Sequence, residues 1–239
     1  MEKMSEKEFV KSLKELGIEL SKDQKKQFKK YAEFLLDYNS HTNLTAIKTI
    51  EDVYLTHFYD SVLMTKYFDI SGKTVLDIGS GAGFPGVPLK ICFPNIDITL
   101  LDSNGKKTDF LTKLKDVLKL DYVVINDRAE KYNSKKRESF DIVTSRAVTA
   151  MPTLAELSIP FVKEGGMFIP YKGVLDPTLE NGIYAIETLG GDVTRVVETL
   201  LPVKNASRSF VFVNKKCKTP DEYPRSFDKI SKKPLQKLQ

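Results

Sequence analysis

Short apolar segments and segments of helical periodicity alternate along this chain from residue 74 onward. The apolar segments predict β-strands at 74–80, 96–103, 122–127, 140–146 and 166–173. Apolar residues recur at helical spacing in the intervening chain, and helices are predicted at 89–93, 106–120 and 152–162. Strands and helices in this order favour an α/β fold, in which a mostly parallel sheet carries helices on both faces.

The C-terminal third departs from this alternation. After a helix predicted to begin at Asp176-Pro177, two β-rich segments follow each other at 192–201 and 207–216. They predict an antiparallel hairpin at one edge of the sheet, an ending characteristic of one branch of this architecture, the cofactor-dependent methyltransferases. The stretch from Lys204 onward holds ten basic and three acidic residues, so it is strongly basic. It is interpreted either as a phosphate-binding arm or as a frayed, solvated tail.

Only helices are predicted before residue 71. Two of them begin with capping boxes, formed by Ser5 with Glu8 and by Ser21 with Gln24. A third helix is predicted over 50–68. We therefore expect three parts: a helical extension over 1–70 that packs on the core, the α/β domain over 71–216, and the basic tail over 217–239.

Composition limits the class of protein further. With 239 residues, 41% of them hydrophobic and 29% charged, the chain suits one large globular domain with an appendage. It has neither an apolar run long enough for a membrane span nor the pattern of a signal peptide. Cys92 and Cys217 are the only cysteines and lie far apart, so neither a disulfide framework nor a metal site is expected. These features favour a cytoplasmic protein without membrane association.

The sharpest local signal is a glycine-rich segment, 79–86, directly after the first predicted strand. Such a loop lets the backbone turn tightly against a ligand, which in this type of sheet lies beyond the carboxyl ends of the strands. Gly81-x-Gly83-x-x-Gly86 also matches the dinucleotide fingerprint, so a nicotinamide-dependent dehydrogenase is one alternative.

Two carboxylates close the first two strands of the predicted sheet. Asp77 precedes the glycines, where it suits a cofactor with ammonium and sulfonium cations better than a pyrophosphate. Asp102 follows the glycines by about 20 residues and suits the ribose hydroxyls of either cofactor. The structural alternative is that Asp77 caps a loop and Asp102 caps the next helix.

Two further strand ends complete the candidate site. Ala129 and Glu130 follow the third strand, where the adenine of such a cofactor would lie; a simple surface turn is the alternative. Arg146 closes the fourth strand and faces the space where a methyl acceptor would enter. A buried arginine needs an anionic partner, and an ion pair with Asp77 or Glu130 is the rival explanation.

Taken together, the sequence resembles the bacterial 16S ribosomal RNA guanine-N7 methyltransferases known as the glucose-inhibited division protein B family. The segments that carry the resemblance cover nearly the whole chain: Asn43-Leu44-Thr45, His57-x-x-Asp60-Ser61, LDIGSGAGFPGVPL (76–89), LLDSNGKKTDFL (100–111), Arg128-Ala129-Glu130, Ser145-Arg146-Ala147, Lys172-Gly173, the strand with Arg208, and Thr219-Pro220-x-x-Tyr223-Pro224-Arg225.

The resemblance implies a Rossmann-like enzyme that transfers a methyl group from S-adenosylmethionine to N7 of one guanine in 16S rRNA. Its partner would be that RNA or the small ribosomal subunit. The cofactor contacts that the resemblance implies are Gly79, Phe84, Asp102, Ala129, Glu130 and Arg146. The strand end and the glycine loop discussed above add Asp77 and Gly81. Arg146 is also the candidate catalytic residue. The candidate RNA contacts outside the tail are Arg128, Lys172 and Arg208.

Guanine N7 carries an unprotonated lone pair, so its methylation needs no general base. We therefore expect no catalytic histidine, and His57 is interpreted as a structural partner of Asp60 on the same helix. A monomer is expected, since no extended apolar patch is evident. Besides the dehydrogenase, a methyltransferase for a small molecule or protein and a non-catalytic ribosome-binding protein remain as alternatives.

Overall fold

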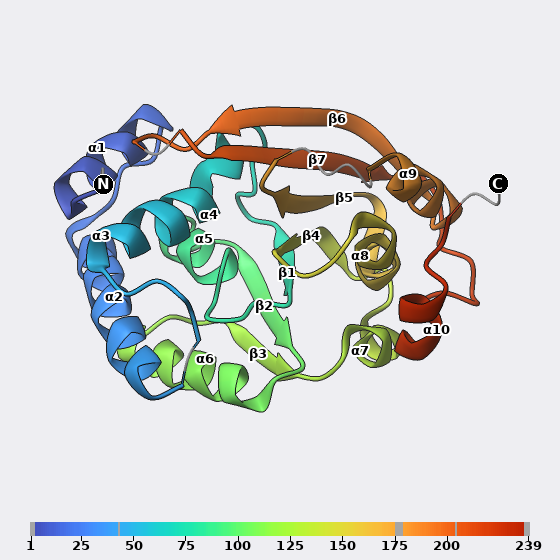
Figure 1. Ribbon diagram of the computed structural model, residues 1–239, viewed down its shortest axis with the longest axis horizontal. Helices are drawn as coiled ribbons and strands as arrows, with labels where there is room; N and C mark the ends of the chain where they lie inside the picture. The colour runs from blue at the N-terminus through green and yellow to red at the C-terminus, as the bar shows by residue number, and fades with distance from the viewer. Residues whose placement is uncertain (1–2, 43, 175–178, 204, 237–239) are drawn as a thin grey trace.

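A seven-stranded sheet forms the centre of the computed structural model, which describes residues 3–42, 44–174, 179–203 and 205–236 (Figure 1). In the order β3-β2-β1-β4-β5-β7-β6, the strands are β1 (Thr74–Ile78), β2 (Asp97–Asp102), β3 (Val123–Asn126), β4 (Phe140–Arg146), β5 (Val162–Lys172), β6 (Gly191–Leu200) and β7 (Ser207–Lys215). Strands β1 to β5 are parallel, and β7 runs antiparallel to β5 and β6. The predicted parallel sheet with an antiparallel C-terminal hairpin is confirmed.

Helices cover both faces of this sheet (Figure 1). One face carries α1 (Glu6–Glu15), α2 (Lys22–Thr42), α3 (Ile50–Asp52), α4 (Asp60–Val62), α5 (Gly86–Cys92) and α6 (Gly105–Leu118). The other carries α7 (Ala129–Lys136), α8 (Met151–Ser158), α9 (Leu179–Thr188) and α10 (Phe227–Lys232). Because side chains alternate along a strand, Val75 of β1 joins the hydrophobic cluster on the first face and Leu76 joins the cluster on the second.

The N-terminal helices pack on the core next to the glycine loop. Both predicted capping boxes are present: Ser5 with Glu8, and Ser21 with Gln24. Aromatic side chains connect this region to the loop, and the ring of Tyr31 in α2 stacks on Phe84 with centroids 5.4 Å apart. The boundary predicted at residue 70 remains a prediction, since the same hydrophobic cluster contains residues from both sides of it.

The helix predicted over 50–68 is irregular. After α3 the chain forms a π-helical stretch (Val53–Tyr59), in which the N–H of Asp60 donates to the carbonyl of Leu55, five residues earlier. It continues through α4 into a 3-10 turn (Leu63–Lys66). Apolar periodicity in the sequence does not distinguish α-, π- and 3-10 helices, and π-helical segments are frequent at functional sites.

Two further helices replace segments predicted as irregular. The surface turn considered at Ala129 and Glu130 is the start of α7, and the basic tail contains α10. The helix start predicted at Asp176-Pro177 lies outside the described residues, and α9 is described from Leu179.

The described part of the tail packs against the body, so its interpretation as a frayed segment is wrong. Arg225 forms an ion pair with Glu156 of α8, with Nη2 2.6 Å from Oε2. Arg137 donates to the carbonyl of Thr219 over 2.6 Å. Among the described residues, no helix has both the length and the apolar character needed to cross a membrane.

Candidate active site

The glycine loop follows β1 and turns beneath the end of β4. Gly79 has φ +70°, and a Cβ built on it would lie 2.5 Å from Cγ2 of Val148, so only glycine fits this turn. The N–H groups of Gly79 and Ser80 donate to the carbonyl of Leu101 at 2.7 and 3.2 Å, which ties the loop to β2. These hydrogen bonds therefore fix the loop beside the carboxyl ends of β1 and β2.

Asp77, which was predicted to contact a cofactor, lies beneath the glycine loop. Its side chain is fully buried, does not line a described cavity, and accepts the N–H of Gly86 at Oδ2 over 2.9 Å. Oδ1 is also buried and has no hydrogen-bond partner among the described residues. Asp77 thus anchors the loop from below, and its contact with a cofactor stays a prediction.

A pH-dependent stability follows from this burial, which raises the pKa of Asp77 from 3.8 to about 7. Between these pH values the folded protein retains a proton that the unfolded chain has lost, so stability falls as pH rises through the window. Between these two pH values, the free energy of unfolding of Asp77→Asn should therefore rise relative to that of the wild type by up to about 4 kcal/mol. Urea unfolding at about pH 4 and about pH 8 measures this difference; a pH-independent difference would contradict the prediction.

Asp102 ends β2 with its carboxylate facing the loop. Oδ2 accepts the N–H of Gly81 over 2.9 Å and lies 3.7 Å from Nζ of Lys107, and Oδ1 accepts the N–H of Asn104 over 2.9 Å. Each carboxylate oxygen has a second lone pair for another donor. Asp102 therefore orders the loop and can still accept hydrogen bonds from a ligand.

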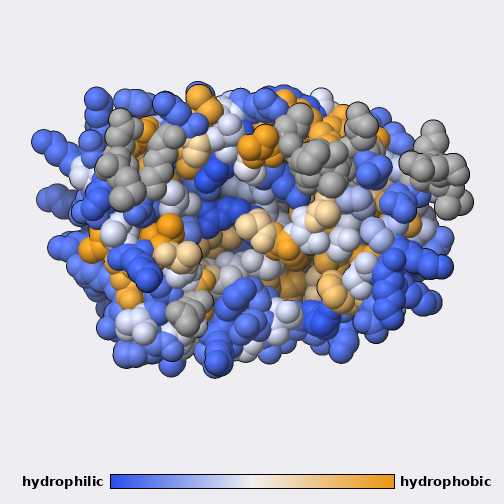
Figure 2. Space-filling view, viewed as in Figure 1, coloured by the Kyte–Doolittle hydropathy of each residue, from blue (hydrophilic) through white to orange (hydrophobic). Residues whose placement is uncertain are grey.

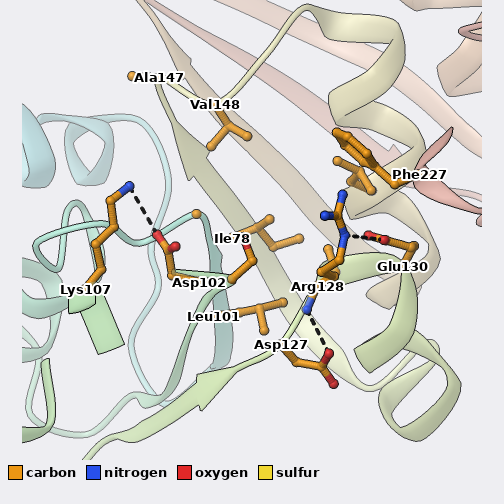
Figure 3. A pocket seen from close by; sticks show the side chains of 14 residues that line it. Ile78, Leu101, Asp102, Lys107, Asp127, Arg128, Glu130, Ala147, Val148 and Phe227 are labelled. Carbon is orange, nitrogen blue, oxygen red and sulfur yellow. Dashed lines mark hydrogen bonds and ion pairs between the residues drawn. The ribbon is translucent and has the colours of Figure 1, made fainter. Parts of the chain in front are cut away.

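The ends of β1 to β4 enclose a cavity of about 330 Å³, which we call cavity 1 (Figure 3). Its lining includes four residues predicted for the cofactor, namely Gly79, Asp102, Ala129 and Glu130. Figure 2 shows a hollow near the middle of the face in view, in which both hydrophilic and apolar residues lie. Besides Asp77, three predicted contacts do not line cavity 1. The N–H of Gly81 is hydrogen-bonded to Asp102, Phe84 is buried under the ring of His57 with centroids 4.3 Å apart, and Arg146 lines a second cavity.

Arg128 also lines cavity 1, apart from the other two predicted RNA contacts, Lys172 and Arg208, and its own RNA contact stays a prediction. Its Nε donates to Oε1 of Glu130 over 2.7 Å, and its guanidinium lies 4.2 Å from the ring centroid of Phe227 (Figure 3). These contacts fix the side chain in the cavity wall.

A second cavity of about 390 Å³, cavity 2, lies between the π-helical stretch and the ends of β4, β5 and β7. The structure brings together three predicted residues in its lining: Arg146, Lys172 and Arg208. Nζ of Lys172 donates to the carbonyl of Thr149 over 2.8 Å. Cavity 2 is thus bordered by three cationic side chains.

Asp60 connects two of these cations. Its Oδ2 lies 3.1 Å from Nη1 of Arg146, and its Oδ1 lies 2.7 Å from Nε of Arg208. Asp60 is 2% exposed, so the carboxylate is almost removed from water. The ion pair of Arg146 with Asp77 or Glu130, considered as a rival explanation, is therefore wrong, because the carboxylate that pairs with Arg146 comes from the N-terminal helices.

His57 completes the surroundings of Arg146. Nη2 of Arg146 lies 3.2 Å from Nδ1 of His57, and since a guanidinium only donates, Nδ1 accepts. Nε2 then carries the proton and donates to Oγ1 of Thr45 over 2.9 Å. Burial and the charge of Arg146 lower the pKa of His57 from 6.5 to about 3, so the ring is neutral. The predicted hydrogen bond of His57 to Asp60 is replaced by these two contacts.

Sequence reasoning assigned no site role to Asp60 or Phe227. Asp60 was named only in the segment that carries the family resemblance and as the structural partner of His57, and its pairing with a distant arginine leaves no periodic signal. Phe227 was counted within a basic tail. The only available signal for it was a large aromatic residue among charged ones.

Ala147 lines both cavities, so they meet at the end of β4. Its φ is +57°, an uncommon conformation for a residue with a Cβ. Backbone strain of this kind is concentrated at functional sites. The described residues include no cluster of three or more His, Cys, Asp or Glu side chains able to hold a metal ion.

Comparison with solved structures supports the fold. A predicted O-methyltransferase from Agrobacterium tumefaciens is 16% identical, with a TM-score of 0.52 over 67% of this chain and 80% of that one. A ribosomal protein L11 methylase from Lactobacillus delbrueckii subsp. bulgaricus is 14% identical, with a TM-score of 0.50 over 68% of this chain and 79% of that one. These likenesses show the methyltransferase fold alone.

Comparison with families and curated relatives goes further. The family model GidB, described as rRNA small subunit methyltransferase G, matches residues 24–196. Proteins named ribosomal RNA small subunit methyltransferase G from Bacillus cereus (strain B4264) and Bacillus cytotoxicus are each 44% identical, over 98% of this chain and the whole relative. The chain therefore belongs to the GidB family of S-adenosylmethionine-dependent rRNA methyltransferases.

Proposed function

We propose that this protein transfers the methyl group of S-adenosylmethionine to N7 of a guanine in 16S rRNA. The observation that carries the proposal is the pair of cavities that meet at Ala147. The wall of cavity 1 combines apolar side chains with polar groups such as Asp102, as a nucleoside requires, and cavity 2 is bordered by cations, as a nucleic acid requires. The names of the relatives support the same substrate class.

The residues of cavity 1 fit S-adenosylmethionine. The carboxylate of Asp102 has lone pairs for the ribose hydroxyls. The first N–H groups of α7, from Ala129 on, have no partner within their helix, and the N-cap residue Arg128 makes no side-chain capping bond in the described structure. These N–H groups suit the acceptor nitrogens of adenine, and we keep Gly79, Ala129 and Glu130 as proposed cofactor residues.

When bound, the cofactor supplies an electrophilic methyl group on its sulfonium. The chain's own task is to hold the acceptor base in line and to exclude water, since N7 needs no deprotonation. Arg146 is suited to position the acceptor, because Asp60, His57 and the carbonyl of Thr56 fix its guanidinium, the last at 3.1 Å. His57 is not suited to act as a base, because the lone pair on Nδ1 is already used by Arg146.

Arg146, Lys172 and Arg208 are the proposed RNA-binding residues. Their common cavity favours binding of the sugar-phosphate backbone around the target base, with an affinity that falls steeply as salt rises. We propose that the protein works as a monomer in the cytoplasm, where its ribosomal substrate is made.

Methyl transfer from labelled S-adenosylmethionine tests the function. Small ribosomal subunits, naked 16S rRNA and small nucleotides are offered separately, and the labelled RNA is cleaved with borohydride and aniline, which act at N7-methylguanosine. We expect labelling and cleavage at one guanine in RNA or in subunits. Labelling confined to small molecules would instead support the alternative, a small-molecule methyltransferase.

A further inference from the structure

The C-terminal segment contributes a side chain to cavity 1. Phe227, the first residue of α10, lines the cavity together with Leu157 of α8 and Val148, which follows β4 (Figure 3). Its side chain is 36% exposed, so its ring is partly open to the cavity and solvent. Nothing in the function proposed above uses this residue.

Ion pairing fixes the position of Phe227. Two residues earlier, the backbone N–H, Nε and Nη2 of Arg225 donate to the carboxylate of Glu156, at 2.9, 2.8 and 2.6 Å. Glu156 is fully buried in α8, and Ile230 on the next turn of α10 is fully buried as well. The segment is therefore held on both sides of Phe227, and the ring is presented at a defined place.

Arg128 supports the same ring. Its guanidinium lies over the ring of Phe227 and is held there by the 2.7 Å hydrogen bond to Glu130. The two side chains are thus stacked on each other at the cavity wall, one from the end of β3 and the other from the C-terminal segment. A stacked aromatic and guanidinium pair next to apolar side chains is the kind of site on which a nucleobase stacks.

We propose that Phe227 binds the adenine ring of the methyl donor, so that the C-terminal segment forms part of the cofactor site. This inference rests on the proposed function. Asp102 at the end of β2 fixes the ribose end, and Figure 3 shows that Arg128 and Phe227 lie across the cavity from it. The base then extends from Asp102 toward Phe227, with Val148 and Leu157 completing the slot.

Calorimetric titration with S-adenosylhomocysteine tests the proposal without catalysis. Loss of a stacking side chain costs roughly 5- to 150-fold in affinity, and because Phe227 is partly exposed we expect about tenfold for Phe227→Ala. Phe227→Tyr should bind as the wild type does. The matched control is Tyr184→Ala, since Tyr184 of α9 is 40% exposed and does not line cavity 1. Wild-type affinity in Phe227→Ala would overturn the proposal, whereas absence of binding by the wild-type protein would overturn the proposed function as well.

Fluorescence gives an independent readout. The chain contains no tryptophan, so Phe227→Trp introduces the only indole. Its emission should change on saturation with S-adenosylhomocysteine or with adenosine alone, and Tyr184→Trp should show no change. An unchanged emission of Phe227→Trp at ligand concentrations that calorimetry shows to be saturating would overturn the proposal.

Discussion

Asp60→Asn is expected to lower methyl transfer to the ribosomal substrate at least about 100-fold, because a misplacement of about 1 Å at a reacting site can cost that much. The carboxylate of Asp60 is shared by Arg146 and Arg208, and an amide offers a single acceptor oxygen. One guanidinium then loses its fixed orientation at cavity 2. The free energy of unfolding should fall by about 3–5 kcal/mol, as when one partner of a buried ion pair is removed.

Labelled methyl transfer to small subunits measures the first effect, and urea unfolding measures the second. The affinity for S-adenosylhomocysteine should change little, because Asp60 does not line cavity 1. Glu138→Gln is the matched control: Glu138 pairs over 3.1 Å with Lys215, which is 1% exposed, and neither residue lines cavity 1 or 2. It should lose stability and retain transfer. Wild-type turnover in Asp60→Asn would show that Arg146 needs no such support.

Asp102→Ala is expected to weaken binding of S-adenosylhomocysteine about 100-fold. A hydrogen bond to a charged group contributes about 1.5–3 kcal/mol, and the carboxylate is proposed to accept from the ribose hydroxyls. The substitution also removes the acceptor for the N–H of Gly81, so the loop itself becomes less ordered. Both effects act on the cofactor and not on the RNA.

Calorimetry measures this loss, and Asp97→Ala is its control. Asp97 begins the same strand, β2, and its exposed side chain lies at the opposite edge of the sheet from cavity 1. It should bind the ligand with wild-type affinity. If Asp102→Ala also binds normally, the ribose is held elsewhere and the proposed placement of the cofactor is wrong.

The sequence predicted four of the residues that line cavity 1 because they follow strand ends. In a parallel sheet these ends meet at one edge, so Gly79, Asp102 and Ala129 come together whatever the details of the helices. Strand positions themselves were readable, since buried strands form continuous apolar runs bounded by turn residues; β4 spans the predicted range 140–146.

The remaining parts of the site depend on contacts between distant segments. Arg146 and Asp60 are separated by 86 residues, and their pairing depends on how the N-terminal helices pack on the sheet. The π-helical geometry around His57 is a consequence of that packing and leaves no pattern in the sequence. Charge counting likewise failed for the tail, because the Arg225 charge is used inside the protein by Glu156.

The order of strands at the edge of the sheet has a consequence for biosynthesis. β7 lies between β5 and β6 but is translated after both of them. Until Ser207–Lys215 leaves the ribosome, β5 has an open hydrogen-bonding edge and β6 lacks its neighbouring strand. Open edges recruit strands from other chains. Nascent chains interrupted before β7 should therefore aggregate or require chaperones, and the finished sheet forms late in translation.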